Sequence, residues 1–220
     1  EHIVQRQPKL RIRPHKSARS REAVERLGYL PVYEKENAFA YLDRFDFVVV
    51  IDADVAIRPN APDITEELGP ADFGGVVERE MPITAEYKQK IKGYSWHQYS
   101  KLDDVDWRWN DAGAEFFNMG IMVLRNTIQK YLDDTPEDFI RRPEFEPLVN
   151  GEGHWKWSTD QTMLNWWVRR SGMKYRKLSW RWNALYGAVR DLSDAYFIHF
   201  FLSSKMPRGG AEIPAMVERL

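Results

Sequence analysis

Two carboxylates, Asp52 and Asp54, are separated by a single residue at the end of an apolar run, and this spacing can support metal chemistry. The run itself, Phe47 to Ile51, favours β-structure throughout and predicts a strand buried on both faces. Because burying a bare carboxylate is costly, the pair should lie where the strand meets solvent or a cation. Hard oxygen ligands suit Mg²⁺ or Mn²⁺, commonly with a phosphate completing the shell. A solvated acidic turn is the alternative, and the motif alone does not decide between the two.

Three further segments carry polar side chains that could do chemistry. Asn118 lies within the apolar run 116–124, Asp160 and Gln161 open a predicted helix, and His199 lies in the last apolar run, 196–201. Each also has an ordinary structural explanation: a satisfied core amide, a helix cap and a core histidine. The residue types by themselves leave both interpretations open.

The segments that must position these side chains alternate between apolar runs and helical patterns. We predict strands at 47–51, 73–77 and 116–124, and shorter extended pieces at 175–178, 181–185 and 196–201. Helices are expected near 85–92, at 126–141 and at 161–170, with an irregular segment after residue 92. This alternation predicts an α/β fold with a mixed central sheet flanked by helices.

The bulk composition limits the classes of protein to consider. With 220 residues, 43% of them hydrophobic, and no visible linker, we expect a single domain over 1–220. The net charge of −1 gives no electrostatic argument for a nucleic-acid partner, and the absence of cysteine excludes disulfides and thiol catalysis. No apolar run approaches the roughly 20 residues of a membrane span, and no signal peptide is visible. We therefore expect a cytoplasmic protein; a fragment of a secretory or Golgi-lumen protein is the alternative.

Four motifs, taken together and in order, resemble the GT-A-fold (Rossmann-type) glycosyltransferases, and most closely family 8, which contains glycogenin and the lipopolysaccharide galactosyltransferases. The resemblance runs from about Lys35 to Lys205, which is most of the chain. The motifs are Asp52-x-Asp54, Phe117-Asn118-Met119-Gly120, Asp160-Gln161 followed by Leu164-Asn165, and His199-x-x-Leu202-x-x-Lys205.

The resemblance implies a metal site and a diphosphate site. It implies that Asp52, Asp54 and His199 bind the metal, and this mixture of oxygen and nitrogen ligands suits Mn²⁺ slightly better than Mg²⁺. Lys205 is implied to contact the phosphates of a UDP-sugar donor. Lys35 lies at the position where the family carries a basic donor-contact residue; a solvated surface lysine is the alternative.

The resemblance also implies roles around the donor sugar. Asn118 is expected to face the sugar, Asp160 to bind its hydroxyls, and Gln161 to lie beneath the anomeric carbon. The family implies transfer of a hexose with retention, in which the acceptor attacks from the front face and the leaving diphosphate takes its proton. The expected acceptor is a glycan, a glycolipid or a small molecule.

Three features depart from the family pattern. Leu202 replaces a glycine of the last motif, and Met206-Pro207 replaces Pro-Trp after the lysine. Family members begin with a strand and loop that grip uracil and ribose, and no such segment is recognisable upstream of Gln5. Either residues 1–14 fill this role in a divergent form, or this first nucleotide-binding strand is lacking.

Two other functions compete with a transferase. The first is a non-catalytic domain of the same fold that binds a sugar nucleotide or a glycan. The second is a haloacid-dehalogenase-type phosphotransferase, in which the first aspartate of the D-x-D would be the nucleophile. That class needs a paired acidic motif after another strand. The candidates, Asp103-Asp104 and Asp133-Asp134, do not follow one.

Overall fold

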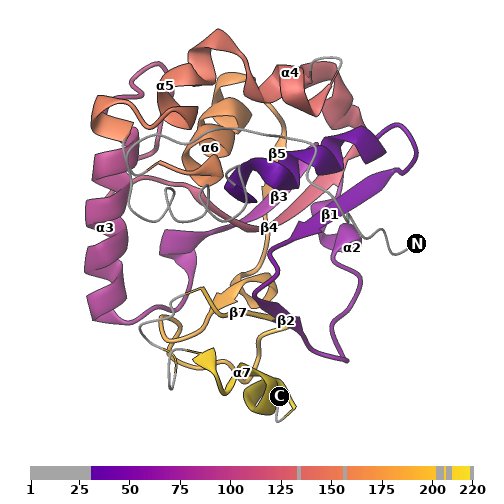
Figure 1. The fold of residues 1–220 in the computed structure, drawn as a ribbon. Helices are drawn as coiled ribbons and strands as arrows, with labels where there is room; N and C mark the ends of the chain where they lie inside the picture. Colours follow the sequence, from indigo (N-terminus) through magenta and orange to yellow (C-terminus); the bar gives the residue numbers. More distant parts are fainter. Residues whose placement is uncertain (1–30, 133–134, 156–157, 202–205, 207–209, 219–220) are drawn as a thin grey trace.

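The computed structural model describes residues 31–132, 135–155, 158–201, 206 and 210–218. Its larger sheet has four strands in the order β1-β4-β3-β5: β1 (Phe47–Ile51), β4 (Phe117–Arg125), β3 (Phe73–Val77) and β5 (Tyr175–Lys177). The β1–β4 and β4–β3 pairs are antiparallel, and the β3–β5 pair is parallel. The predicted mixed sheet flanked by helices is confirmed (Figure 1).

The prediction that the Phe47–Ile51 strand is buried on both faces is wrong. All five of its residues are only partly buried, whereas residues 117–124 of β4 are fully buried. Within the described part of the chain, β1 is one of the two outer strands of the larger sheet, whereas β4 lies between β1 and β3. An apolar run does not show which of two such strands is central, because both are rich in β-favouring residues.

A smaller sheet of three strands lies below the larger one in Figure 1. Its order is β2 (Val55–Ile57), β7 (Phe197–His199) and β6 (Ala184–Leu185). β2 pairs antiparallel with β7, and β6 pairs parallel with it. Since β1 ends at Ile51 and β2 begins at Val55, residues 52–54 are the corner where the chain passes from one sheet to the other.

The helix predicted at 161–170 is confirmed, starting one residue earlier, whereas the other two predicted helices differ from the sequence pattern. The α-helices of the described residues are α2 (Thr65–Leu68), α3 (Ala85–Tyr99), α4 (Pro136–Ile140), α5 (Glu146–Val149), α6 (Asp160–Arg170) and α7 (Ile213–Val217). The 3₁₀ segments are η1 (Pro31–Tyr41), η2 (Glu78–Glu80), η3 (Asn126–Tyr131), η4 (Pro143–Phe145), η5 (Gly153–Trp155) and η6 (Trp180–Trp182). No helix among the described residues is both long and apolar enough to cross a membrane.

Two helix predictions need correction. The helix expected near 85–92 continues to Tyr99, because Gly93 lowers helix propensity without breaking the hydrogen-bonded ladder. The single helix expected at 126–141 does not form. Thr135 is extended (φ −134°, ψ 156°) and Pro136 starts a new helix, as expected where a proline excludes helical geometry from the residue before it.

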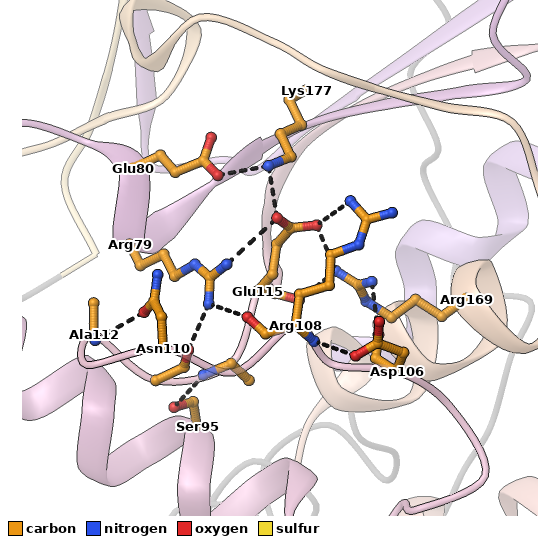
Figure 2. A network of polar contacts seen from close by, with 12 residues as sticks. Arg79, Glu80, Ser95, Asp106, Arg108, Asn110, Ala112, Glu115, Arg169 and Lys177 are labelled. Carbon is orange, nitrogen blue, oxygen red and sulfur yellow. Dashed lines mark hydrogen bonds and ion pairs between the residues drawn. The ribbon is translucent and has the colours of Figure 1, made fainter.

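The loop after α3 contacts the sheet and two neighbouring elements through one buried carboxylate, Glu115 (Figure 2). Its oxygens lie 2.6 Å from Nζ of Lys177, 3.0 Å from Nη2 of Arg169, 3.2 Å from Nη1 of Arg108 and 3.4 Å from Nη2 of Arg79. These four cations come from β5, α6, the loop itself and the segment after β3. The end of this excursion is therefore tied to three elements of the domain, although its composition predicts only irregular structure.

Candidate functional site

The two aspartates of the D-x-D motif lie at the corner between the sheets. Asp52 continues the pairing of β1 by donating its backbone N–H to the Gly120 carbonyl at 2.9 Å. The backbone carbonyl of Asp54 accepts the N–H of Phe200 at 2.8 Å. One aspartate is thereby fixed to β4 and the other to the end of β7, so both sheets determine the distance between their carboxylates.

His199 reaches this corner through the register of the smaller sheet. It pairs with Val55, the residue directly after Asp54. Its Nε2 lies 3.2 Å from Oδ1 of Asp54 and 3.9 Å from Oδ2 of Asp52. One ligand atom from each of the three residues lies within 4.8 Å of the others, so the group could hold a metal ion. Two carboxylate oxygens and one imidazole nitrogen suit a first-row divalent cation.

The space for the histidine ring is made by Gly120. A Cβ at this position would lie 2.3 Å from Cε1 and 2.5 Å from Nδ1 of His199. No side chain can therefore replace glycine here without moving the ring. The glycine thus leaves room for the ring of His199, one of the three residues that could hold a metal ion.

Lys35 connects the D-x-D to the predicted donor-sugar residues. Its Nζ lies 2.8 Å from Oδ1 of Asp52 and 2.8 Å from Oδ2 of Asp160, and it donates to the Met119 carbonyl at 3.1 Å. Burial alone would lower the pKa of Lys35, but Asp160 and Asp52 outweigh it and raise that pKa. The lysine is therefore a fixed cation of the site, and the solvated surface lysine of the sequence alternative is not what forms.

Asp160 and Gln161 project from the first turn of α6. Thr159 caps the helix, because its hydroxyl accepts the Gln161 N–H at 3.3 Å. Asp160 is therefore not the N-cap residue that the structural explanation from the sequence would make it. Burial raises the pKa of the Asp160 carboxyl, while the ion pair with Lys35 opposes this rise. Gln161 is held on both sides: its Oε1 accepts the Met119 N–H at 3.1 Å and its Nε2 donates to the Tyr94 hydroxyl at 3.2 Å.

The imidazole also influences its nearest carboxylate. A hydrogen bond from His199 lowers the pKa of Asp54, although partial burial opposes the shift. This shift favours the ionised form of Asp54 beside the ring, which is the form that could bind a metal ion.

Asn118 is buried, and both ends of its amide are bonded. Its Nδ2 donates to Oε2 of Glu78 at 3.0 Å, and its Oδ1 accepts from Nδ2 of Asn183 at 2.8 Å and from the Gly120 N–H at 3.0 Å. Oδ1 of Asn183 lies 3.0 Å from Nδ1 of His199. The structure thus places Asn118 behind the candidate metal-ligand group of Asp52, Asp54 and His199, in a chain of polar contacts that ends on the histidine.

Sequence reasoning missed Asn183, Glu78 and Tyr94. None of them belongs to a recognised motif, and no local spacing relates them to the D-x-D. One weak signal was available: Asn183 is a polar residue directly before a short apolar strand, a position that requires a partner once buried.

Some of the residues predicted to form the diphosphate and nucleotide sites belong to segments that the structure does not describe. Lys205 and Leu202 lie outside the described residues, so the lysine predicted to contact the diphosphate stays a prediction. Met206 is described and buried. The segment 1–14, predicted as a possible substitute for the first nucleotide-binding strand, also lies outside the described residues.

Comparison with known proteins supports the fold. No family model matches the chain, and no curated protein matches it. Among solved structures, mouse xyloside xylosyltransferase 1 in its apo form is similar, with a TM-score of 0.52 and 14% sequence identity over 90% of this chain and 70% of that chain. The apo bifunctional glycosyltransferase WbbM matches with a TM-score of 0.45 and 16% identity, over 76% of this chain and 31% of that chain. The first match shows a glycosyltransferase fold of the GT-A type.

Proposed function

We propose that this protein is a metal-dependent glycosyltransferase that moves a hexose from a nucleotide-sugar, a UDP-sugar, to an acceptor, with retention. One observation supports this most directly: a group of Asp52, Asp54 and His199 able to hold a metal, joined through Lys35 to Asp160 at the start of α6. The two carboxylates proposed to bind the metal and the one proposed to bind sugar hydroxyls, Asp160, thus belong to one connected group of side chains.

The metal proposed for this site is Mn²⁺, or Mg²⁺ in its place. Asp52, Asp54 and His199 would hold it, and their two oxygens and one nitrogen fit such an ion. Bound there, it would supply Lewis-acid stabilisation of the leaving diphosphate.

The protein groups around the metal would bind and orient the donor. Lys35 supplies a fixed positive charge beside the D-x-D and, in the proposed function, contacts the donor phosphates. Asp160 accepts hydrogen bonds from sugar hydroxyls, and Gln161, held by Met119 and Tyr94, presents its side chain to the anomeric carbon. Lys205 completes the diphosphate contacts. Asn118 contributes to this site either by contacting the donor sugar or by acting through the buried residues that it contacts, Glu78 and Asn183.

The acceptor proposed is a glycan, a glycolipid or a small molecule with a hydroxyl nucleophile. No protein carboxylate is assigned as its base: of the described carboxylates at this site, Asp52 and Asp54 are assigned to the metal, and Asp160 is paired with Lys35. The acceptor hydroxyl would attack the anomeric carbon from the face that the diphosphate leaves, and the departing diphosphate would take its proton. Attack on that face gives retention.

The test is hydrolysis of a panel of UDP- and GDP-sugars with and without Mn²⁺, comparing the wild type with Asp54→Ala. We expect metal-dependent release of the nucleoside diphosphate from one donor, reduced at least about 100-fold in the variant. Asp191→Ala, at an exposed aspartate that is not part of the metal group, is the matched control and should retain full activity.

Absence of turnover with every donor, together with Mn²⁺ binding that does not depend on Asp54, would contradict the proposal. Donor binding without turnover would instead identify the chain as a non-catalytic sugar-nucleotide-binding domain of the same fold.

A further inference from the structure

A chain of three buried polar side chains, one carboxylate and two amides, runs behind the metal-ligand group and ends on the ring nitrogen of His199 that faces away from it. Its members are Glu78, Asn118 and Asn183, all buried, with Asn183 fully inaccessible. They come from three separate places in the fold: Glu78 is the first residue of η2, Asn118 lies at the start of β4, and Asn183 directly precedes β6. Each contact in the chain measures 2.8 to 3.0 Å.

The direction of this chain is fixed by a backbone group. The Gly120 N–H can only donate, and it donates to Oδ1 of Asn118 at 3.0 Å. The other end of this amide, Nδ2, therefore faces the carboxylate of Glu78, which accepts it. Oδ1 of Asn118 must then accept from Asn183 as well, so the Asn183 amide places its nitrogen toward Asn118 and its oxygen toward His199.

The carbonyl oxygen of Asn183 cannot donate, so the histidine has to. Nδ1 of His199 must carry a hydrogen and donate it to Oδ1 of Asn183, 3.0 Å away. Nδ1 is thereby unavailable to a metal. Nε2, which points at Asp54 and Asp52, is therefore the ring nitrogen left to offer its lone pair to a cation. The reverse orientation of Asn183 would oppose two amide oxygens in a buried site.

We propose that Asn183, oriented by Asn118, is a positioning residue that fixes His199 as an Nε2 metal ligand. The proposal rests on the metal site of the proposed function and adds to it the reason that the histidine ring has one usable nitrogen and one orientation. Gly120 contributes twice, since its missing side chain admits the ring and its N–H sets the direction of the chain. Outer residues of this kind typically change metal affinity about 10- to 100-fold when they are replaced.

The experiment measures Mn²⁺ binding to the purified protein by electron paramagnetic resonance. The signal of unbound Mn²⁺ gives the affinity, and pulsed measurements detect a nitrogen bonded directly to the ion. Asn183→Leu keeps the size of the side chain but cannot accept the Nδ1 hydrogen. We expect it to weaken Mn²⁺ binding about 10- to 100-fold and to abolish the nitrogen coupling.

Asn183→Asp separates positioning from general structural support. Its carboxylate still accepts from Nδ1 of His199, but it can no longer donate to Asn118, so the protein should be less stable to heat while nitrogen coordination is retained. Gln98→Leu removes another buried amide, one that accepts from Thr162 outside the chain, and should leave Mn²⁺ binding unchanged. Asn118→Leu removes the group that orients Asn183, so the Asn183 amide can rotate and part of the nitrogen coupling should be lost. If Asn183→Leu does not fold, Asn118→Leu tests the positioning role in its place.

The outcomes distinguish this inference from the proposed function. Nitrogen coupling and affinity within about twofold of the wild type in Asn183→Leu would overturn the positioning role while leaving the metal site intact. Loss of coupling in Asn183→Asp as complete as in Asn183→Leu would overturn it too, because support alone would then explain both. A wild-type protein that does not bind Mn²⁺ would instead remove the metal site of the proposed function, and this inference with it.

Discussion

A single glycine determines whether the metal-ligand group can form. His199 lies so close to Gly120 that a methyl group there would overlap Cε1 and Nδ1 of the ring. The glycine is not needed for an unusual backbone conformation, since its φ does not fall in the left-handed region. Its requirement is purely steric, and it belongs to a histidine 79 positions further along the chain.

We therefore expect Gly120→Ala to displace His199 and to weaken Mn²⁺ binding at least about tenfold, measured by calorimetric titration. The matched control is Gly93→Ala in α3, where an added Cβ meets nothing within 4 Å. That change should stabilise the protein by up to about 1 kcal/mol and leave metal binding unchanged. Equal Mn²⁺ affinity in Gly120→Ala and the wild type would show that the histidine is not a ligand.

Among the elements, the loop between α3 and β4 depends on charge rather than on apolar packing alone. Glu115 is buried with only 2% of its side chain exposed, and its carboxylate is shared among cations from β5, α6 and the loop. Burial opposes its ionisation, but hydrogen bonds from Lys177 and Arg169 outweigh burial and lower the pKa of Glu115 to about 2. The loop is thus held most firmly when this carboxylate is charged.

Glu115→Gln should lower the free energy of unfolding by about 3 kcal/mol at neutral pH, because it leaves buried cations without their partner. The folded-state pKa lies below the unfolded value of about 4.5, so the contribution of Glu115 is present above that value and is lost as the pH falls toward 2. Denaturant unfolding of both proteins across this range should show the difference between them shrinking.

Glu80→Gln is the control for this prediction. Glu80 pairs with the same Lys177 but is about half exposed, so its loss should cost less than about 1 kcal/mol. A difference between Glu115→Gln and the wild type that does not depend on pH would contradict the assignment of the stabilisation to the ionised carboxylate.

For the whole molecule, the metal-ligand group joins two sheets. Asp52 follows β1 of the larger sheet and His199 belongs to β7 of the smaller one, with Asp54 between β1 and β2. Since an ion bound there would contact both sheets only in the folded state, it should stabilise the molecule as a whole.

At a Mn²⁺ concentration about 100 times its Kd, binding should contribute about 2.7 kcal/mol and raise the Tm by roughly 5–10 °C for a domain of this size. Thermal unfolding with and without Mn²⁺ measures this shift. Asp54→Ala should show almost none of it. A shift of equal size in that variant would mean that Mn²⁺ stabilises the fold at another place.

Local sequence patterns were sufficient to predict several of the strands and helices of this protein. The strand before the D-x-D, the strand containing Asn118 and the helix opened by Asp160 each follow from apolar periodicity and capping within a dozen residues. The motif order also indicated that Asp52, Asp54 and His199 belong together, and the structure places them within reach of one ion.

Only the tertiary structure determined which strands lie inside the sheet and which side chains of the candidate site contact one another, because both depend on pairing between segments that are distant in the sequence. The antiparallel register of β2 with β7 brings His199 to Asp54, and pairing with both β1 and β3 makes β4 an interior strand of the larger sheet while β1 stays at its edge. The contact of Asn183 with His199 and the two ion pairs of Lys35 likewise join residues that no local spacing relates. A sequence shows which side chains could bind a metal or a proton. The fold determines which of these side chains come into contact. Burying a polar group is unfavourable unless it has a hydrogen-bonding partner, and for these residues only three-dimensional packing supplies that partner.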